Sequence, residues 1–222
     1  MKIKAMIPVR SGSQRVKNKN IRPFAGSSLL EIKINQLKQI SSLDGIVVNS
    51  NDDTMLHIAE KMGCEPVKRE QYYATDIIDN RELCEYLVRN VDADIVVYAP
   101  VTSPLIKKES IEKAIETYLK IYPQYDALTT VTVIKEFLYC GYSPLNFNPE
   151  KKPRSQDLPD DYVYLNSALY ILSQETMTKT RNITGINPYF FKIDKDESFD
   201  IDDEIDFEFA EHFYMKKHCI SN

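Results

Sequence analysis

The segment from Arg10 to Asn20 concentrates side chains that suit a phosphate ligand. It reads RSGSQRVKNKN and holds four cations among small polar residues. Cationic side chains and closely approaching backbone N–H groups are what binds a polyphosphate. The spacing matches neither G-x-x-x-x-G-K followed by Ser or Thr, nor G-x-G-x-x-G. By itself the segment therefore predicts either a phosphate-binding loop or an ordinary solvated basic loop.

A second charged segment lies near the other end of the chain. Asp200 and Asp202 flank Ile201, and the run continues as Asp203-Glu204-Ile205-Asp206. In extended backbone, positions i and i+2 face the same side, so the two carboxylates could share one cation. Oxygen ligands of this kind hold Mg²⁺ together with substrate phosphates and water. The same residues also fit a solvated acidic helix start, because acids are favoured near helix N-termini.

Two further segments have polar residues in turn-like settings. Thr102-Ser103-Pro104 is typical of a helix-entry turn, with Ser103 as the cap and Pro104 in the first helical position. Arg154 lies in a proline-framed segment, where an arginine could clamp a carboxylate or simply lie at the surface. The three histidines have no spacing suited to metal binding or to nucleophilic catalysis.

Strands and helices must position these polar and charged side chains. In the first part of the chain, strand patterns alternate with helix patterns. Short continuous apolar runs predict buried strands, and apolar residues at helical spacing predict helices. The alternation predicts an α/β fold with a mainly parallel sheet, in which ligands bind at the carboxyl ends of the strands. The expected strands are 2–9, 45–49, 65–68 and 94–99, and the expected helices are 29–40, 53–62, 81–90 and 111–122.

The pattern changes after Asp126. Residues 128–134 and 168–172 predict further buried strands, and residues 204–217 predict a closing helix. Between the two strands, residues 139–161 contain four prolines and many charges. Irregular segments of this length inside a compact domain are usually functional or lie at an interface. We therefore expect residues 139–161 to form such an excursion.

Composition and charge make several classes of protein poor candidates. The 222 residues have a net charge of −5, whereas nucleic-acid-binding proteins normally show a basic footprint. The length fits one domain, or one domain with an appended subdomain. No run approaches the ~20 apolar residues of a membrane helix, and no secretory signal is visible. The four widely spaced cysteines fit reduced thiols. We expect a cytoplasmic protein whose partners include neither nucleic acid nor a membrane.

Taken together and in order, these segments resemble the acylneuraminate cytidylyltransferase family, the CMP-sialic acid synthetases. Residues 7–20 are similar to the family's opening signature, I-P-A-R-x-G-S-K-R followed by a Lys-Asn pair that corresponds to Lys19-Asn20. Residues 199–206 are similar to its closing metal motif, and Thr102-Ser103-Pro104 matches its central turn. The ordered combination is more specific than any single motif and favours the functional interpretation of both charged segments.

The resemblance implies a Rossmann-like sheet flanked by helices, of the nucleotide-diphospho-sugar transferase type. It implies one domain over residues 1–222, with a small dimerisation and sugar-binding subdomain inserted at about 131–170. The implied reaction transfers CMP from CTP to the anomeric hydroxyl of a sialic-acid-like nonulosonic acid and releases pyrophosphate. Mg²⁺ dependence, with Mn²⁺ as an alternative ion, and a homodimer are also implied. Positioning and charge neutralisation dominate such chemistry, so we expect no protein nucleophile.

Roles carry over from the family only where a position of this chain matches its motifs. The opening loop would grip the triphosphate, the closing motif would hold the metal, and the segment after the excursion would face the sugar acid. The implied catalytic residues are Arg10, Lys19 and Asp202; the nucleotide-binding residues are Arg10, Ser13, Arg15, Lys19, Asn20, Arg69 and Asn80; the substrate-binding residues are Lys135, Arg154, Asn166 and Tyr170; and the metal ligands are Asp200 and Asp202.

The sequence departs from the family pattern mainly on the sugar side. Gln14 replaces a common lysine of the opening loop, Pro100-Val101 replaces Gln-Pro, and Ser167 follows Asn166 where glycine is usual. These changes leave CTP use intact and leave the acceptor open among N-acetylneuraminate, KDN, and legionaminate or pseudaminate types. One alternative is a same-fold nucleotidyltransferase for another acid such as KDO, which the sialate-like segment 154–170 disfavours. The other is a catalytically inactive nucleotide-binding homologue.

Overall fold

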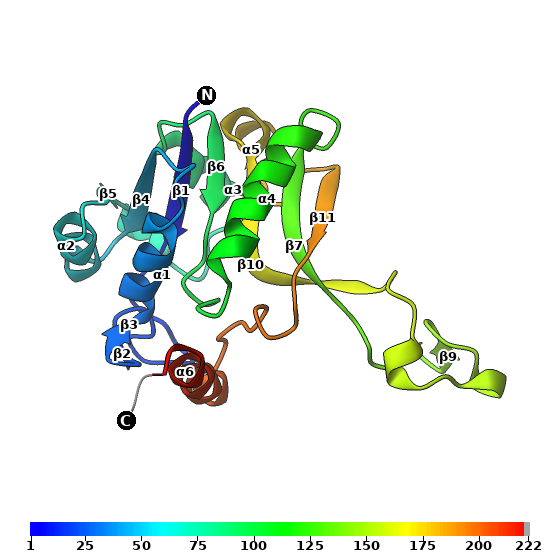
Figure 1. The fold of residues 1–222 in the computed structure, drawn as a ribbon. Helices are drawn as coiled ribbons and strands as arrows, with labels where there is room; N and C mark the ends of the chain where they lie inside the picture. The colour runs from blue at the N-terminus through cyan, green and yellow to red at the C-terminus, as the bar shows by residue number, and fades with distance from the viewer. Residues whose placement is uncertain (220–222) are drawn as a thin grey trace.

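The computed structural model describes residues 1–219, and a seven-stranded sheet lies at its centre (Figure 1). In chain order its strands are β1 (Ile3–Pro8), β4 (Gly45–Ser50), β5 (Glu65–Lys68), β6 (Ile95–Tyr98), β7 (Ala127–Val133), β10 (Val163–Ser173) and β11 (Pro188–Lys192). They are ordered β11-β7-β10-β6-β1-β4-β5 across the sheet. β10 runs antiparallel to β6 and β7, and the other neighbours are parallel. The expected α/β fold with a mainly parallel sheet is confirmed.

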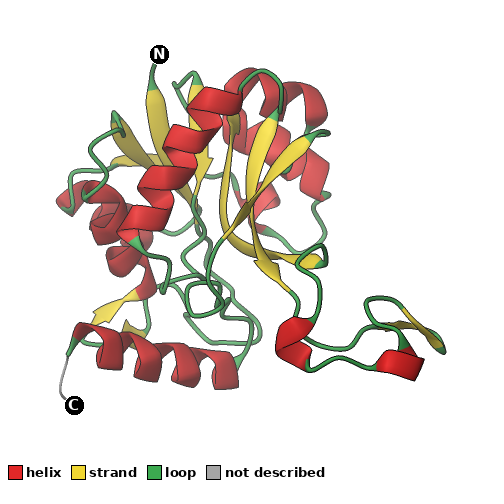
Figure 2. Cartoon of the chain, turned by 45° about the vertical axis from the view of Figure 1, so that its right-hand side comes forward, coloured by secondary structure: helices red, strands yellow, loops and turns green. Residues whose placement is uncertain are grey.

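Alternating side chains of the strands form two apolar cores, one on each face of the sheet. On β1, Ala5 and Ile7 belong to one core and Met6 belongs to the other. On β4, Val48 and Val47 divide in the same way. Successive side chains of a strand point to opposite faces, so a continuous apolar run supplies both cores at once. Helices cover both faces of the sheet as a result (Figure 2).

Within residues 1–219, six α-helices pack against this sheet or against one another. They are α1 (Leu29–Lys38), α2 (Asp53–Lys61), α3 (Asn80–Arg89), α4 (Lys108–Ile121), α5 (Gln174–Thr180) and α6 (Glu204–His218). Helices α1, α2, α4 and α6 contribute to one core, and α3 and α5 contribute to the other. The side chains of Ser28, Asp52 and Asp79 cap α1, α2 and α3 by accepting hydrogen bonds from backbone N–H groups.

The turn after β6 differs from the sequence prediction. Helix α4 begins at Lys108, so the prediction that Ser103 caps it was wrong. Polar side chains of α1 hold the turn instead: Lys33 Nζ donates to the carbonyl oxygen of Ser103 at 2.8 Å, and Gln36 Nε2 donates to that of Pro104 at 2.5 Å. The sequence also missed the short helix α5 and the edge strand β11, and it began β10 at Ala168, although the strand starts at Val163.

Residues 134–162 leave the body of the molecule as an arm between β7 and β10 (Figures 1 and 2). The arm holds the two-residue strands β8 (Tyr139–Cys140) and β9 (Ser143–Pro144) and two short 3-10 turns. Phe147 packs edge-on against Phe137 and Tyr139, with ring centroids 4.9 and 5.4 Å apart. The expected irregular excursion is confirmed, whereas its role in dimerisation stays a prediction.

Two general features of the chain bear on its setting. Across residues 1–219 the structure contains no helix with the length and apolarity that a membrane span requires. The cysteines are free thiols, with Cys64 buried, Cys84 partly buried, and Cys140 and Cys219 exposed.

Candidate active site

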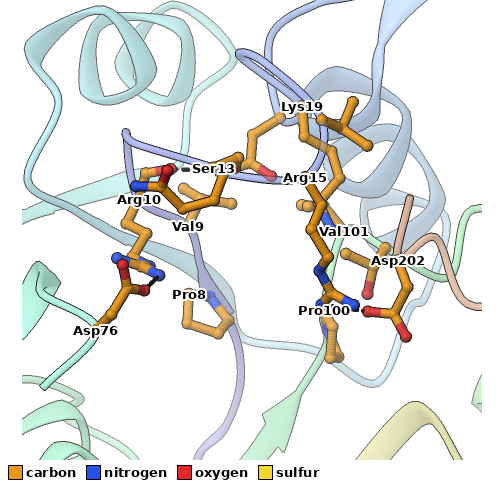
Figure 3. A pocket seen from close by; sticks show the side chains of 14 residues that line it. Pro8, Val9, Arg10, Ser13, Arg15, Lys19, Asp76, Pro100, Val101 and Asp202 are labelled. Carbon is orange, nitrogen blue, oxygen red and sulfur yellow. Dashed lines mark hydrogen bonds and ion pairs between the residues drawn. The ribbon is translucent and has the colours of Figure 1, made fainter. Parts of the chain in front are cut away.

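A cavity of about 300 Å³ opens at the carboxyl ends of β1 and β6 (Figure 3). Its walls are the loop after β1, the turn after β6 and the segment before α6. Parallel sheets bind ligands at this edge. The structure thus brings together six residues predicted from the sequence to form a site, although they are distant along the chain. They are Arg10, Ser13, Arg15, Lys19, Asn20 and Asp202.

Hydrogen bonds fix the basic loop to the end of the sheet. Asn20 donates its side-chain amide to the carbonyl oxygen of Arg10 at 2.9 Å and closes the loop on itself. The backbone N–H of Ser11 donates to Asn51 Oδ1 at 3.0 Å, and Asn51 Nδ2 donates back to Ser11 Oγ at 2.8 Å. Gly12 has a φ of +83°, which glycine adopts without steric cost. Contacts within the protein therefore hold the loop at the end of the sheet.

Two arginines reach the cavity from opposite sides (Figure 3). Arg10 donates to the carbonyl oxygen of Ala74 at 2.7 Å and forms an ion pair with Asp76. Arg15 donates to Asp202 Oδ1 at 2.7 Å. Guanidinium groups in such positions suit phosphate oxygens, which they can bind through two donors at once.

Lys19 joins the basic loop to the acidic segment. Its Nζ donates to the carbonyl oxygen of Ile201 at 2.7 Å. The N–H of Ile201 donates to the carbonyl oxygen of Thr102 at 2.9 Å, and its side chain is fully buried. Burial lowers the pKa of Lys19, and the charges of Asp200 and Asp202 oppose that change. The bonds to Lys19 and Thr102 fix Ile201 between the loop after β1 and the turn after β6.

Asp200 and Asp202 flank this anchored residue and have oxygens that suit a divalent cation. Asp200 Oδ1 is buried and has no hydrogen-bond partner among the described residues. Burial raises the pKa of Asp200, a side-chain hydrogen bond from Thr102 opposes this change, and the charge of Asp202 adds to it. A buried carboxylate oxygen without a donor, close to a second carboxylate, fits Mg²⁺ or Mn²⁺, because both ions take oxygen ligands. The donor set therefore matches the metal that the sequence predicts.

The remaining acids of this run belong to helix α6. Asp203 caps the helix by accepting from the N–H of Asp206, and Asp206 accepts in return from the N–H of Asp203. Glu204 pairs with Arg22 at 2.6 Å. The start of helix α6 thus accounts for the acids that follow Asp202. Asp200 and Asp202 are the two acids of this run that are available to a metal ion.

A second cavity of about 420 Å³ meets the first at Asp202. It lies between the start of β10 and the segment that follows β11. Its lining residues are Tyr164, Leu165, Asn166, Lys195, Ser198, Phe199, Asp200 and Asp202. A group bound in the first cavity and a group bound in the second would therefore meet beside the two carboxylates.

Two predicted nucleotide-binding residues lie outside the linings of both cavities. Arg69 is 3% exposed and donates to the side-chain and backbone oxygens of Asn49 at 2.6 and 3.0 Å. Burial lowers its pKa to about 10. Asn80 is the first residue of α3 and is exposed. Their contact with a nucleotide stays a prediction.

The predicted sugar-binding residues are spread over the body and the arm. Asn166 lines the second cavity, but its amide is already bonded to the hydroxyls of Thr130 and Thr132 at 2.7 and 2.9 Å. Tyr170 is 6% exposed and donates to Ser167 Oγ at 3.3 Å.

Lys135 and Arg154 belong to the arm and form ion pairs with Asp160 and Asp157 there. Neither residue lines the two cavities of its own chain. Their contact with a sugar acid, like that of Tyr170, stays a prediction.

Two charged residues line the cavities without having been candidates from the sequence. Asp76 comes from the loop before α3, which carries no motif and reaches the site only through the fold. Lys195 lines the second cavity. Its place shortly before Asp200 and Asp202 was the one available signal, namely a cation close to a predicted metal motif.

An α/β sheet with a cationic cavity at its ligand-binding edge and an adjoining carboxylate pair has the features of a nucleotidyltransferase. The sequence model of the family described as Cytidylyltransferase matches residues 4–222. The chain belongs to this family, and it is therefore an enzyme of the nucleotidyltransferase class.

Curated relatives cover nearly the whole chain. Post-translational flagellin modification protein B of Campylobacter coli is 27% identical and aligns over 95% of this chain and 94% of its own length. Pseudaminic acid cytidylyltransferase of Campylobacter jejuni is 25% identical over 98% of both chains. N-acylneuraminate cytidylyltransferase of Escherichia coli is 27% identical over 97% of this chain, which spans 53% of that relative.

Solved structures share the fold at low sequence identity. CMP:2-keto-3-deoxy-manno-octonic acid synthetase complexed with CTP has a TM-score of 0.72 and 15% identity, covering 98% of this chain and 100% of the other. The 4-diphosphocytidyl-2C-methyl-D-erythritol synthase of Anaerococcus prevotii has a TM-score of 0.71 and 14% identity, covering 96% and 98%. These likenesses concern the fold alone.

Proposed function

We propose that this enzyme transfers CMP from CTP to the anomeric hydroxyl of a nonulosonic acid and releases pyrophosphate. One observation carries the proposal: a cavity lined by Arg10, Arg15 and Lys19 meets a second cavity at Asp202, next to Asp200. The cations suit a triphosphate, and the second cavity is placed to hold an acceptor. The names of the relatives, which specify N-acylneuraminate and pseudaminic acid, support CTP as donor and a sialic-acid-like acid as acceptor.

The proposed reaction is a displacement at the α-phosphorus of CTP. The anomeric oxygen forms a bond to that phosphorus, the bond to the oxygen that leads to the β-phosphate breaks, and the hydroxyl proton is released to solvent. Arg10 and Lys19 would neutralise charge that accumulates on the leaving pyrophosphate, and the hydrogen-bonded loop would hold both in place. Catalysis of this kind depends on positioning and electrostatic stabilisation, without a covalent enzyme intermediate.

Asp200 and Asp202 would hold Mg²⁺, with Mn²⁺ as a substitute that takes the same oxygen ligands. When bound, the ion supplies positive charge for the phosphate oxygens. Of the two carboxylates, Asp202 accepts from Arg15, and Asp200 Oδ1 is buried without a hydrogen-bond partner among the described residues.

The proposal includes a homodimer formed through the arm. Tyr142 is fully exposed, and Tyr139 and Leu145 beside it are 56% and 47% exposed. Large apolar side chains gathered on a thin projection are typical of a surface that a second chain covers. A second copy would also give Arg154 a route to an acceptor cavity, which it does not line in its own chain. Sedimentation of the wild type and of a Tyr139→Ser, Tyr142→Ser double variant tests this, with a monomeric wild type as the contradicting result.

The test of the reaction is pyrophosphate release from CTP with a panel of acceptors. The panel holds N-acetylneuraminate, KDN, legionaminate, pseudaminate and KDO, each with Mg²⁺, with Mn²⁺ and with EDTA. We expect release with a nonulosonate and its loss in EDTA. Exclusive turnover of KDO would select the alternative acceptor. Binding of CTP without turnover of any acid would reject the proposal in favour of an inactive homologue.

A further inference from the structure

The second cavity contains the group that an acidic acceptor requires. A sugar acid carries a carboxylate next to its anomeric carbon, and a carboxylate binds most strongly to a cation. Arg10, Arg15 and Lys19 line the first cavity, where a triphosphate would use them. Among the described residues of one chain that line the second cavity, Lys195 is the one cation.

The acids around Lys195 leave its charge available. Its chain neighbours Asp194 and Asp196, together with Glu197, surround a different cation, Lys107, whose Nζ lies 3.6, 3.8 and 3.1 Å from their oxygens. Asp200 and Asp202 are the residues proposed to hold the metal. Lys217 also pairs with Asp196, at 2.7 Å, so two cations offset two of these three negative charges. The ion pair of Lys195 is with Glu136 and not with any of the three acids.

Lys195 already binds a carboxylate, although a replaceable one. Its Nζ forms an ion pair at 3.0 Å with Glu136, a residue at the base of the arm. Both side chains are exposed, at 79% and 62% of their surfaces. Exposed ion pairs contribute little to stability, so a carboxylate held by further contacts can displace such a partner. Next to this pair, the hydroxyls of Tyr164 and Ser198 lie 3.3 Å apart and add polar groups to the wall.

We propose that Lys195 binds the carboxylate of the acceptor and that Glu136 occupies this position until the acceptor arrives. The inference rests on the proposed function and assigns the group that makes the site select an acid. Lys195 is a binding residue that orients the acceptor with its anomeric hydroxyl toward Asp202. Glu136 competes with the acceptor and couples the base of the arm to the filling of the cavity.

Steady-state kinetics of three single variants test this assignment. Lys195→Met should raise the acceptor KM roughly tenfold, since a hydrogen bond to a charged group contributes about that factor. The KM for CTP should stay within about twofold, because the first cavity is unchanged. Glu136→Gln should lower the acceptor KM, since it removes the competing charge. Lys192→Met is the matched control, because Lys192 lies on β11 and donates to the carbonyl oxygen of Asp160 outside both cavities.

A second readout separates carboxylate binding from a general structural effect. The wild type should prefer the free acid over its methyl ester, Lys195→Met should lose most of this preference, and Lys195→Arg should retain it. Unchanged acid-to-ester preference and unchanged acceptor KM in Lys195→Met would overturn the inference while the proposed function stands. No turnover of any sugar acid by the wild type would instead reject the proposed function, and this inference with it.

Discussion

The two cavities that meet at Asp202 are held in place in different ways. On the nucleotide side, Asn20 closes the basic loop on itself, and Lys19 ties that loop to the buried Ile201. On the acceptor side, the charged pair of Lys195 and Glu136 is exposed and joins the body to the arm. Partly buried hydrogen bonds to the backbone help to preorganise a site, whereas exposed ion pairs rearrange at little cost. The fold therefore fixes the backbone of the basic loop and leaves the Lys195–Glu136 pair of the acceptor side adaptable.

The largest expected effect is at Asp202, where the cavities meet. Asp202→Asn removes a charge proposed to hold the metal and to face both substrates, so turnover should fall by on the order of 10²–10³. The matched control is Asp203→Asn at the next position, because Asn caps a helix about as well as Asp. Steady-state turnover at several Mg²⁺ concentrations measures both variants. Similar losses in the two variants would mean that the acidic segment acts only as a helix start.

Lys19 should show the next largest effect, confined to the nucleotide side. Lys19→Ala removes a cation from the first cavity and the bond to the carbonyl oxygen of Ile201, so turnover should fall by roughly 10². Lys17→Ala takes a cation from the same loop at an exposed position outside the cavity lining and should change little. The comparison uses kcat and the KM for CTP. Equal effects of the two substitutions would mean that the net charge of the loop, and not the position of Lys19, supports turnover.

The sequence revealed local patterns better than contacts between distant segments. The strand–helix alternation and the basic loop could be predicted, because strand burial and anion binding leave local patterns. Asp76 could not be predicted, because it lies far from Arg10 in the sequence and meets it only in the folded chain. The turn at Ser103 was misjudged because its partner, Lys33, lies far away on α1. Contacts between distant segments leave no periodic or local signal, so Asp76 and the partner of the Ser103 turn could not be predicted.

Lys33 supports the turn after β6, which lines the first cavity, and its burial makes stability depend on pH. Burial lowers its pKa to about 7, against an ordinary value of about 10.4 in an unfolded chain. Between these values the unfolded chain binds more protons than the folded chain. The resulting cost to stability is absent above the window, grows as pH falls through it, and is complete below about pH 7.

Lys33→Met should therefore raise the free energy of unfolding by a few kcal/mol near neutral pH. Loss of the hydrogen bond to Ser103 should reduce this gain by about 1 kcal/mol. This advantage should shrink as the pH rises toward about 9. Urea unfolding of both proteins across that range measures it. Lys38→Met, an exposed position on the same helix, is the control with a flat profile. An equally flat difference for Lys33→Met would contradict the assignment of a buried, titrating lysine.

The smallest expected effect concerns a departure from the family pattern on the acceptor side. Ser167 stands where glycine is usual, and its φ of +58° lies in the left-handed region, at the irregularity of β10 between Leu165 and Tyr170. A non-glycine residue pays about 1 kcal/mol there. Ser167 offsets part of this cost, because its hydroxyl accepts from Tyr170 at 3.3 Å. Its backbone carbonyl oxygen accepts from Ser103 at 3.5 Å, a bond that glycine would keep.

Ser167→Gly should therefore raise the free energy of unfolding by at most about 1 kcal/mol. Ser167→Ala, which keeps the strained backbone and loses the hydroxyl, should lower it slightly. Thermal or urea unfolding distinguishes these changes, and the acceptor panel shows whether they reach function. An unchanged acceptor preference in both variants would mean that Ser167 affects backbone conformation and not the choice of acceptor. Selection of the acid would then be assigned to Lys195. A changed preference in Ser167→Gly would instead show that the adaptable side extends into β10.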